Sequence, residues 1–374
     1  MTRGRSRSGA SEKVAAAAVR GALLTPLPDG DVRYLPDGLL VIDREGKILH
    51  AGKPERRWAK APLIGGSPDA MIAAPFWDAH IHLPQLPLAG RHAEPLLEWL
   101  RIRVFPEEAR HADAAYARSA TVAFYDALAG AGSAGAGVFT APFPEAGRLA
   151  LEEARERGVP VRAGPPWMDG GPPQLRRSAE DWEAELHALR GRYRCRAAVV
   201  PRFALSCSPP MLARAGRLRR AMRAWVLGHI SETEEEVEAA RRRFPEAGEE
   251  AYARLYDQHR LLGPRTILAH GVHLSEGELA LLAQRRTVIA HCPTANEALG
   301  SGRMPLERLR RHGVRWCLAS DVGAGTDPCL LEAIRGFLRV HRGRAATGAA
   351  EAYFRASWAG ADALSADTAN SAAV

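Results

Sequence analysis

The stretch FWDAHIHLPQ, residues Phe76–Gln85, decides the fold and chemistry expected of this sequence. It places His80 and His82 two positions apart at the end of an apolar run, MIAAPFW. Side chains two apart in an extended strand point to the same face, so both imidazoles face one side. Histidine is a preferred zinc ligand, and the pair therefore predicts a metal site at a strand end. The competing interpretation is two polar residues at the exit of a strand.

Apolar strands alternate with helical patterns through most of the chain. Ala224–Ile230 and Val288–Cys292 are examples of the short apolar runs typical of buried strands. Strands that alternate with helices indicate parallel strands joined by crossover helices. About eight strands can be counted, which predicts an α/β fold with a (β/α)₈ TIM-like barrel. Further expected elements are a strand over Ala197–Ser206 and helices over Glu94–Phe105, Ala109–Ala131 and Phe354–Leu364.

A small β unit is expected ahead of the barrel. Arg20–Gly52 contains short alternating runs separated by Asp-Gly and Glu-Gly, which indicates hairpin strands, and Arg56–Pro68 has the Pro and Gly content of a linker. Residues 1–16 are basic and Ser-rich, which favours a disordered tail over a transit peptide. The predicted organisation is a tail at 1–16, a small β subdomain and linker at 17–70, the barrel at 71–345, and a C-terminal helix and tail at 346–374.

Composition narrows the class of protein. The chain has 374 residues, 46% of them hydrophobic, which is ample for a large core. No apolar run is long enough to span a membrane, and the five cysteines have no CxxC spacing, so we expect a cytoplasmic protein without a membrane partner. The net charge of +8 permits nucleic-acid binding, but the Arg residues are spread over helix-like faces and mixed with Glu, so we expect no nucleic-acid partner.

Polar residues follow several of the expected strands. His229 ends the strand in AWVLGHISE, with Glu232 three residues later; His270 ends RTILAHG, His291 ends VIAHCP, and Asp321 ends WCLASDVGAG. Catalytic groups of a barrel come from the carboxyl ends of different strands. Each of these residues alone also fits a local hydrogen bond at a strand end. Their repetition after successive strands favours a shared metal site.

The residue types suit metal-assisted hydrolysis. Three imidazoles and a carboxylate fit Zn²⁺ or Fe²⁺ and leave a position for water, whose pKa the metal lowers toward neutrality. Asp321 is suited to bind the metal and accept the water proton, and Glu232 to pass a proton to a substrate nitrogen. The alternative for Glu232 is a solvated position beside the acidic run Glu234–Glu236, with Ser231 or Thr233 as the cap of that helix.

The motifs HIH, GHISE, AHG, HCPTAN and SDVGAG, in this order, resemble those of the amidohydrolase superfamily. Within it, LLEWLRIRVFPEEAR at Leu96–Arg110 and PRFALSCS at Pro201–Ser208 are similar to segments of the guanine deaminase family. The similarity runs from Pro75 to Leu338. The resemblance implies a zinc-dependent hydrolase that deaminates guanine to xanthine and ammonia in purine catabolism or salvage, with a small-molecule purine as its partner.

The resemblance also implies roles for individual residues. The ligands it implies for one zinc ion are His80, His82, His229 and Asp321, with His270 beside the metal; Fe²⁺ remains the alternative that the residue types allow. The catalytic residues it implies are Glu232, Asp321 and His270, and the residues it implies around the purine are Gln85, Arg202, Phe203 and His291, the last at the rim. An arginine can donate to a carbonyl oxygen and a phenylalanine ring can stack on a base. Without the resemblance, Arg202 also fits a surface ion pair, Phe203 a position in the core, and Gln85 an amide that faces solvent.

Two departures from the family pattern stand out. Ala319-Ser320-Asp321 replaces the usual Gly-Thr-Asp, and the C-terminal strands that complete the small β subdomain have no counterpart here. The subdomain is therefore expected to be incomplete, either because the sequence is a fragment or because the subdomain is completed in another way. Its unpaired edges favour aggregation or a homodimer. Other functions left open are an aminohydrolase or chlorohydrolase acting on another amino-substituted heterocycle, and a non-catalytic purine-binding homologue.

Overall fold

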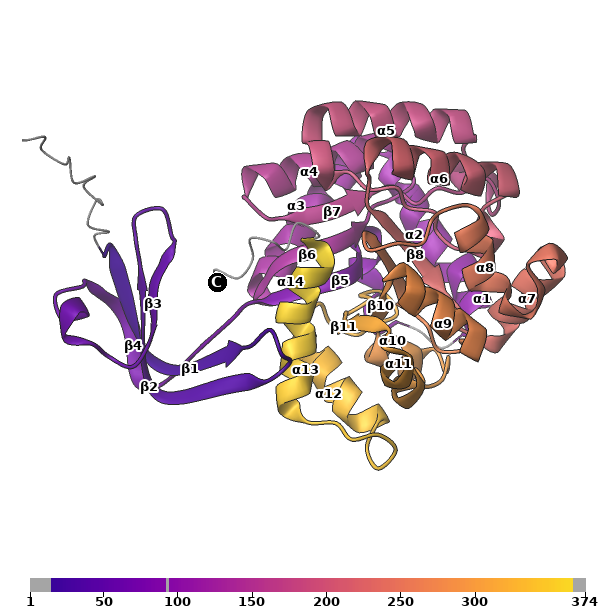
Figure 1. Cartoon of the computed structure of the whole chain (residues 1–374). Coiled ribbons are helices and arrows are strands. Elements are labelled where there is room, and N and C mark those ends of the chain that lie inside the picture. The colour runs from indigo at the N-terminus through magenta and orange to yellow at the C-terminus, as the bar shows by residue number, and fades with distance from the viewer. Residues whose placement is uncertain (1–14, 92–93, 366–374) are drawn as a thin grey trace, which may run out of the picture. The chain divides into compact units, whose positions relative to one another are not determined.

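The computed structural model describes residues 15–91 and 94–365, which divide into two units, residues 15–74 and residues 75–365 (Figure 1). Most of the basic tail predicted at 1–16, and the C-terminal tail from 366 onward, lie outside the described residues. Within the described part of the chain, no helix combines the length and apolarity that a membrane span requires.

The first unit is a single four-stranded sheet in the order β3-β2-β1-β4. Its strands are β1 (Ala17–Pro26), β2 (Val32–Ile42), β3 (Ile48–Gly52) and β4 (Leu63–Ala73). β2 pairs antiparallel with β1 and with β3, and the two turns contain Gly30 (φ 94°) and Gly46 (φ 78°). The hairpins predicted from Asp-Gly and Glu-Gly are thereby confirmed, because glycine adopts the positive φ of these turns without steric cost.

The prediction of a linker at Arg56–Pro68 is wrong. It contains a short helical turn, η1 (Arg56–Trp58), and the first half of β4, which pairs in parallel with β1. Gly66 has φ 101°, and a Cβ there would lie 1.9 Å from the carbonyl oxygen of Arg20, where the β1–β4 register shifts. The glycine that suggested a linker therefore permits close approach of two strands at an irregular pairing.

The second unit contains two parallel sheets. β5 (Phe76–His82), β6 (Ser133–Phe139) and β7 (Val161–Gly164) form one sheet, and β8 (Val226–Ile230), β9 (Thr266–His270), β10 (Val288–His291) and β11 (Arg315–Leu318) form the other. Every residue of β9 and β10 is buried, as expected for parallel strands covered on both faces. Figure 1 shows the helices of this unit arranged around the strands.

Residues 197–201 lie between the two sheets. Isolated parallel bridges join Ala197 to Ala163 of β7, Pro201 to Trp167, and Val199 to Val226 of β8. The strand predicted over Ala197–Ser206 is thus reduced to these bridges, and its end forms the 3-10 turn η7. At the opposite edges, the backbone N–H of Asp321, just past β11, donates to the carbonyl oxygen of His80 on β5 at 3.0 Å.

Helices connect the strands of the second unit. Their bounds are α1 (Leu96–Trp99), α2 (Phe105–Ala109), α3 (Ala114–Gly130), α4 (Pro144–Glu156), α5 (Ala179–Tyr193), α6 (Pro209–Met222), α7 (Glu234–Arg243), α8 (Ala251–Gln258), α9 (Glu276–Arg285), α10 (Pro293–Ala298), α11 (Leu306–His312), α12 (Leu330–Val340), α13 (Ala349–Ala356) and α14 (Trp358–Leu364). The shorter helical turns are η2 (Leu83–Leu88), η3 (Leu100–Val104), η4 (Arg110–Ala112), η5 (Pro173–Leu175), η6 (Arg194–Arg196), η7 (Ala204–Ser206) and η8 (Pro245–Glu250).

Several predicted helices differ in detail from those observed. The helix expected over Glu94–Phe105 consists of α1 and the π-helical turn η3, and α2 follows directly. The next helix begins at Ala114 rather than Ala109, because the Asp113 side chain accepts hydrogen bonds from the N–H groups of Ala115 and Tyr116 at 2.8 and 3.0 Å. The final helix is two helices, α13 and α14, which break at Ser357.

Candidate active site

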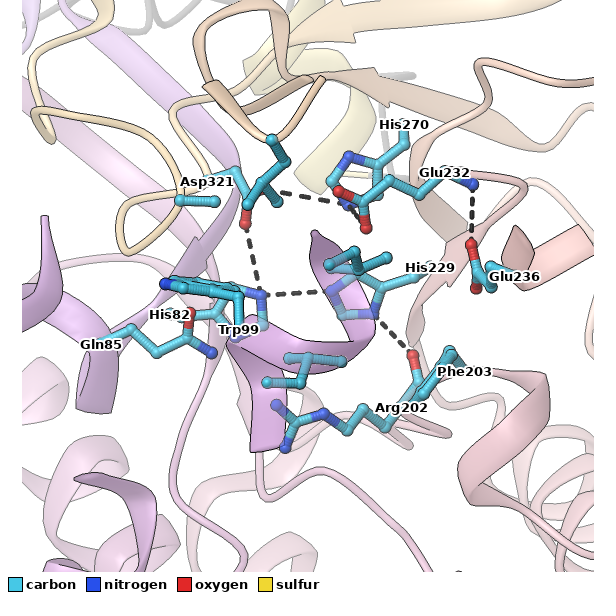
Figure 2. Close-up of a pocket in the computed structure, with 14 residues that line it drawn as sticks. His82, Gln85, Trp99, Arg202, Phe203, His229, Glu232, Glu236, His270 and Asp321 are labelled. Carbon is cyan, nitrogen blue, oxygen red and sulfur yellow. Dashed lines mark hydrogen bonds and ion pairs between the residues drawn. The ribbon is translucent and has the colours of Figure 1, made fainter. Parts of the chain in front are cut away.

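Residues predicted to bind a metal lie at the carboxyl ends of four parallel strands. His80 and His82 belong to the end of β5, His229 to β8 and His270 to β9, and Asp321 follows β11 by three residues. Figure 2 shows His82, His229, His270 and Asp321 turned toward one another. Carboxyl ends of parallel strands meet at one edge, which brings together residues far apart in the sequence.

Positive φ angles mark three of these strand ends. Ser231 (φ 50°), His270 (φ 74°) and Asp321 (φ 50°) adopt the left-handed conformation that non-glycine residues rarely enter. Local hydrogen bonds hold the turns, including one of 2.9 Å from the Gly271 N–H to the Ile230 carbonyl oxygen. Such strain concentrates at functional sites, and here it redirects the chain at the candidate ligands themselves.

Four donor atoms converge on one point. The Nε2 atom of His82 lies 3.1 Å from His80 Nε2 and 3.2 Å from His229 Nε2. The Oδ1 atom of Asp321 lies 3.2 Å from His80 Nε2 and 3.4 Å from His82 Nε2. Ligands that each lie about 2.0–2.2 Å from a tetrahedral metal are separated by about 3.3–3.6 Å. The donor set therefore fits a single divalent metal ion, with His270 Nε2 3.9 Å from Asp321 Oδ2 at its side.

The three imidazoles are electrically neutral at neutral pH. Burial, together with neighbouring imidazoles, holds the pKa of His80, His82 and His229 well below the ordinary value. A neutral imidazole offers the lone pair that a metal requires. The electrostatics of the site thus agree with its spacing.

Hydrogen bonds fix the tautomers of two of the histidines. His229 Nδ1 lies 2.6 Å from the carbonyl oxygen of Arg202, and His270 Nδ1 lies 2.9 Å from Asn296 Oδ1. Because both oxygens can only accept, each Nδ1 carries the proton and each Nε2 presents its lone pair toward the donor cluster. Among the described residues, the Nδ2 group of Asn296 has no hydrogen-bond partner.

Asp78 forms hydrogen bonds to both β5 and the segment after β11, next to the candidate ligands. Its carboxylate accepts from the backbone N–H groups of His80 (3.2 Å) and Ser320 (3.1 Å), and from the Ser320 hydroxyl. Burial raises the pKa of Asp78 to about 7. Ser320 stands where the related family has threonine, and its hydroxyl supplies the same kind of donor.

Glu232 lies at the same edge, next to His270. Its Oε1 atom accepts from the Ser301 hydroxyl at 3.3 Å, and its Oε2 atom lies 3.4 Å from His270 Nε2. Burial, reinforced by the charges of Asp321 and Glu236, raises the pKa of Glu232 well above the ordinary carboxyl value. The site therefore favours the protonated acid, as a proton donor requires.

The acidic run after Glu232 is divided between solvent and the interior. Glu234 is exposed, whereas Glu236 is buried and accepts the Glu232 backbone N–H at 2.9 Å and the Tyr252 hydroxyl. The cap of α7 is Thr233, whose side chain accepts from the N–H of Glu236. Glu236 thus holds the backbone of Glu232 in place from a buried position. This contact does not fit the alternative in which Glu232 lies on a solvated acidic face.

Gln85, Arg202 and Phe203 line one wall of the pocket. The Arg202 guanidinium donates to Glu108 through two bonds, 2.6 Å from NH1 to Oε2 and 2.9 Å from NH2 to Oε1, and Gln85 Nε2 donates to Glu108 Oε1 at 3.3 Å. The Arg202 and Glu108 side chains are 3% and 1% exposed. Arg202 is therefore not part of a surface ion pair, and the buried Gln85 does not face solvent.

Apolar side chains close the pocket above this wall. Leu96, Trp99 and Leu100 come from α1 and η3, and the Trp99 indole N–H donates to the Arg91 carbonyl oxygen at 3.2 Å. The described lining consists of His82, Gln85, Leu96, Trp99, Leu100, Arg202, Phe203, His229, Glu232, Glu236, His270, Leu299, Asp321 and Ala324. Figure 2 shows Trp99, Gln85 and His82 among the side chains that line the pocket. A planar apolar ligand with polar edges suits such a pocket.

His291 occupies a different place from the rim position expected for it. Among the described residues, those lining the pocket do not include His291, whose Nε2 lies 3.1 Å from His341 Nε2. Its ring also packs on Trp316 and Phe337. Strand-end position alone therefore does not place a histidine in the described lining of the pocket, because it does not tell where the side chain points.

Several residues of the site are not predicted from the sequence, and Glu108, Glu236 and Asn296 are three of them. Glu108, Glu236 and Asn296 each contact a residue that was identified, namely Arg202, Glu232 and His270 respectively. Asn296 lies in the HCPTAN motif and Glu108 in the FPEEAR segment, so both had a sequence signal. Nothing in the run Glu234–Glu236 distinguishes its buried member except the helical spacing of four residues from Glu232.

The fold and site define a family. Residues 71–371 match the amidohydrolase family. The chain belongs to this family, and it is a hydrolase that acts on C–N bonds.

Within that family, the chain is similar to guanine deaminases. A probable guanine deaminase of Deinococcus radiodurans is 38% identical over 359 residues, which cover 91% of this chain and 81% of the relative. The solved Escherichia coli guanine deaminase superposes with a TM-score of 0.85 at 29% identity, covering 95% of this chain and 85% of that one. A Clostridium acetobutylicum guanine deaminase with bound guanine in its active site has a TM-score of 0.86 at 24% identity, covering 93% and 86%, and shares the fold.

Proposed function

We propose that this chain hydrolyses guanine to xanthine and ammonia. The observation that carries the proposal is the meeting of three features in one pocket: a metal-type donor set, the buried acid Glu232, and the wall formed by Arg202, Gln85 and Phe203. Similarity to guanine deaminases over most of the chain supports the same substrate.

A zinc ion, with Fe²⁺ as the alternative, is the proposed cofactor. The residues proposed to hold it or to lie beside it are His80, His82, His229, Asp321 and His270. When bound, the metal supplies a Lewis acid that lowers the pKa of a water molecule at the substrate. Neutral imidazoles and an enclosed carboxylate are the donor types that support this assignment.

Asp321 and Glu232 are proposed to move the protons. Asp321 accepts a proton from water as the water oxygen bonds to the ring carbon that carries the amino group. Glu232, kept protonated by burial, donates its proton to the adjacent ring nitrogen, which keeps that proton in xanthine. The C–N bond then breaks: the amino group takes the proton held by Asp321 and leaves as ammonia, while the hydroxyl on the ring carbon gives its proton to Glu232 and becomes a carbonyl. His270, 3.4 Å from Glu232 Oε2, is proposed to hold the acid in place.

The wall opposite the proton donor is proposed to recognise the base. Arg202 has donors suited to the carbonyl oxygen of guanine, Gln85 can both donate and accept at a ring edge, and the Phe203 ring can stack on the purine. A site built to pair with a carbonyl rejects analogues that lack it, because its buried donor is then unpaired. We place His291 outside this set, because its ring faces His341.

The test is incubation of the zinc-loaded protein with guanine while ammonia and the guanine-to-xanthine absorbance change are followed. We expect one ammonia per guanine and turnover that stops when a chelator is added. Ammonia or chloride released from another ring, with none from guanine, would indicate a related aminohydrolase or chlorohydrolase. Bound metal without turnover on any ring would indicate a purine-binding homologue.

The strands of the second unit are proposed to close into a (β/α)₈ barrel. The bridges of residues 197–201 to β7 and β8 supply an eighth parallel segment, and the Asp321–His80 hydrogen bond links the outer edges. The division into a small β subdomain at 17–70 and a barrel at 71–345 remains part of this proposal, and it agrees with a boundary after Ala74.

A homodimer and a cytoplasmic location also remain proposals. On β4, an edge strand of the first unit, Leu63, Ile64 and Met71 are 63%, 67% and 61% exposed, which supports association through an apolar edge. The described thiols of Cys207, Cys292, Cys317 and Cys329 are free, which is consistent with a reducing compartment.

A further inference from the structure

We propose that Glu108 makes the ring-binding end of the pocket selective for uncharged purines, by neutralising Arg202 and by holding Arg202 and Gln85 in place. The inference rests on the proposed function and extends it to a residue behind the pocket wall. Glu108 lies on α2, whereas Arg202 follows the bridge at Pro201 and Gln85 lies on η2. One carboxylate therefore joins three separate segments.

The geometry leaves Arg202 free to bind a ligand. Glu108 accepts one hydrogen from NH1 and one from NH2, at 2.6 and 2.9 Å. A guanidinium has five N–H donors in a fixed fork, so three remain after the bidentate pair, and one of these, on Nη1, points to the Met168 sulfur 4.0 Å away. The pair fixes the plane of the fork, and the backbone carbonyl oxygen of the same residue accepts a hydrogen bond from His229 Nδ1. Arg202 thus connects the metal-type cluster to the wall that faces the ring.

Glu108 is the carboxylate that directly compensates the Arg202 charge. Two further described contacts of the guanidinium are the Phe105 ring, with its centroid 5.1 Å from Cζ, and the Met168 sulfur, 4.0 Å from Nη1. Further titratable groups around the pocket or near Glu108 are His82, His111, His229, His270, Glu232, Glu236 and Asp321. An arginine buried to this degree without Glu108 would carry an uncompensated charge.

Charge compensation has a direct consequence for substrate and product. Guanine is neutral near neutral pH, whereas xanthine, with its second ring carbonyl, loses a proton more readily. A neutral Arg202–Glu108 pair offers N–H donors without a net positive field, so it binds a neutral base without favouring the product anion. The same wall without Glu108 would attract the anion and retain the product.

The same carboxylate positions Gln85. Glu108 Oε1 accepts from Gln85 Nε2 at 3.3 Å, which assigns the amide nitrogen to Glu108 and leaves the Gln85 oxygen free to accept. Glu108 is a positioning residue rather than a catalytic one, because it does not belong to the described lining of the pocket.

The test compares Glu108→Gln with a matched control, Glu107→Gln, in the zinc-loaded full chain. Glu107 is the preceding residue on α2, but its carboxylate pairs with Arg110 and Tyr116 rather than with the wall. Calorimetry at a mildly alkaline pH measures binding of xanthine, then largely an anion, and of hypoxanthine, still neutral. In Glu108→Gln we expect the preference for xanthine over hypoxanthine to rise about tenfold or more, and KM for guanine to rise about tenfold with a smaller change in kcat.

Each outcome bears on a different statement. Wild-type protein that releases no ammonia from guanine contradicts the proposed function. If the wild type releases ammonia from guanine but Glu108→Gln has the same preference for xanthine over hypoxanthine as the wild type, the inference alone is contradicted. It is also contradicted if Glu107→Gln raises this preference as much as Glu108→Gln does. If Glu108→Gln does not fold, binding to the wild-type protein still tests the inference. Tighter binding of the xanthine anion than of hypoxanthine contradicts the proposed charge compensation by Glu108, and weaker binding of the anion supports it.

Discussion

Among single residues, Glu232 has the environment with the clearest chemical consequence. Its carboxyl is buried, close to Asp321 and Glu236, and hydrogen-bonded to Ser301. Removing a carboxylate from water and placing it near other negative charges favours its protonated form. A proton donor is thereby prepared before substrate arrives.

Glu232→Gln is expected to lower kcat by about 10²–10⁴-fold, because glutamine preserves the shape but cannot donate and regain a proton. The bound metal should remain stoichiometric, since Glu232 is not among the proposed ligands. Steady-state kinetics and metal analysis on the same sample measure both quantities.

The matched control for this change is Glu234→Gln, two residues away at the start of α7 and exposed to solvent. Its kinetics should equal those of the wild type. Glu232→Gln protein that releases ammonia at the wild-type rate would remove Glu232 from the proton transfer.

Among the secondary-structure elements, β10 and the C-terminal end of α12 are joined by a directed chain of hydrogen bonds through His341, the residue after α12. Arg303 NH1 lies 3.1 Å from His341 Nδ1, and His341 Nε2 lies 3.1 Å from His291 Nε2. Arginine only donates, so His341 Nδ1 accepts, His341 Nε2 carries the proton, and His291 Nε2 accepts it. Both imidazoles must be neutral for this chain to exist.

This chain predicts acid sensitivity. Burial, with the nearby Arg303 charge, lowers the pKa of His341 from 6.5 to about 4. Between these values the unfolded chain binds a proton that the folded chain does not, so stability is intact above pH 6.5 and falls as the pH drops toward 4. His341→Gln, which can accept from Arg303 and donate to His291 without titrating, should reduce the pH slope of the unfolding free energy by about 1 kcal/mol per pH unit in this range.

Denaturant unfolding of the two proteins at several pH values measures this difference. His187→Gln, which replaces an exposed histidine on α5, serves as the control and should leave the slope unchanged. Parallel pH profiles for wild type and His341→Gln would show that His341 does not titrate with unfolding.

For the molecule as a whole, the donor cluster is the point where distant parts of the second unit meet. Its members come from β5, β8, β9 and the segment after β11, and they are buried or nearly so. A metal bound there contacts all of these segments at once, and the unfolded chain has no such preformed site. Metal binding should therefore contribute directly to folding stability.

Chelation of the metal is expected to lower the thermal midpoint of unfolding by about 5 °C or more, because only the folded chain holds the full ligand set. Re-addition of zinc should restore the midpoint, which scanning calorimetry records. Glu232→Gln should show the same shift as wild type, because its ligand set is intact. A midpoint unaffected by chelation and by added zinc would contradict the proposed metal site.

The sequence by itself determined the order of strands and helices and the residue types at the strand ends. Period-two and helical apolar patterns are local, so β8, β9 and β10 were predicted within a few residues, and each candidate ligand stood directly after such a run. His80 and His82 were assigned to one face for the same reason, since alternation along a strand needs no knowledge of its partners.

Only the tertiary structure decided which polar residues meet. Glu108 and Arg202 are 94 residues apart, and their pairing depends on how α2 folds over the pocket wall, which no local pattern records. The same holds for β4, whose pairing with β1 turned a predicted linker into a strand, and for His291, whose ring faces α12. Local periodicity determines which face a side chain occupies, but contacts between distant segments depend on the packing of the whole fold, because burial and hydrogen bonding are satisfied only there.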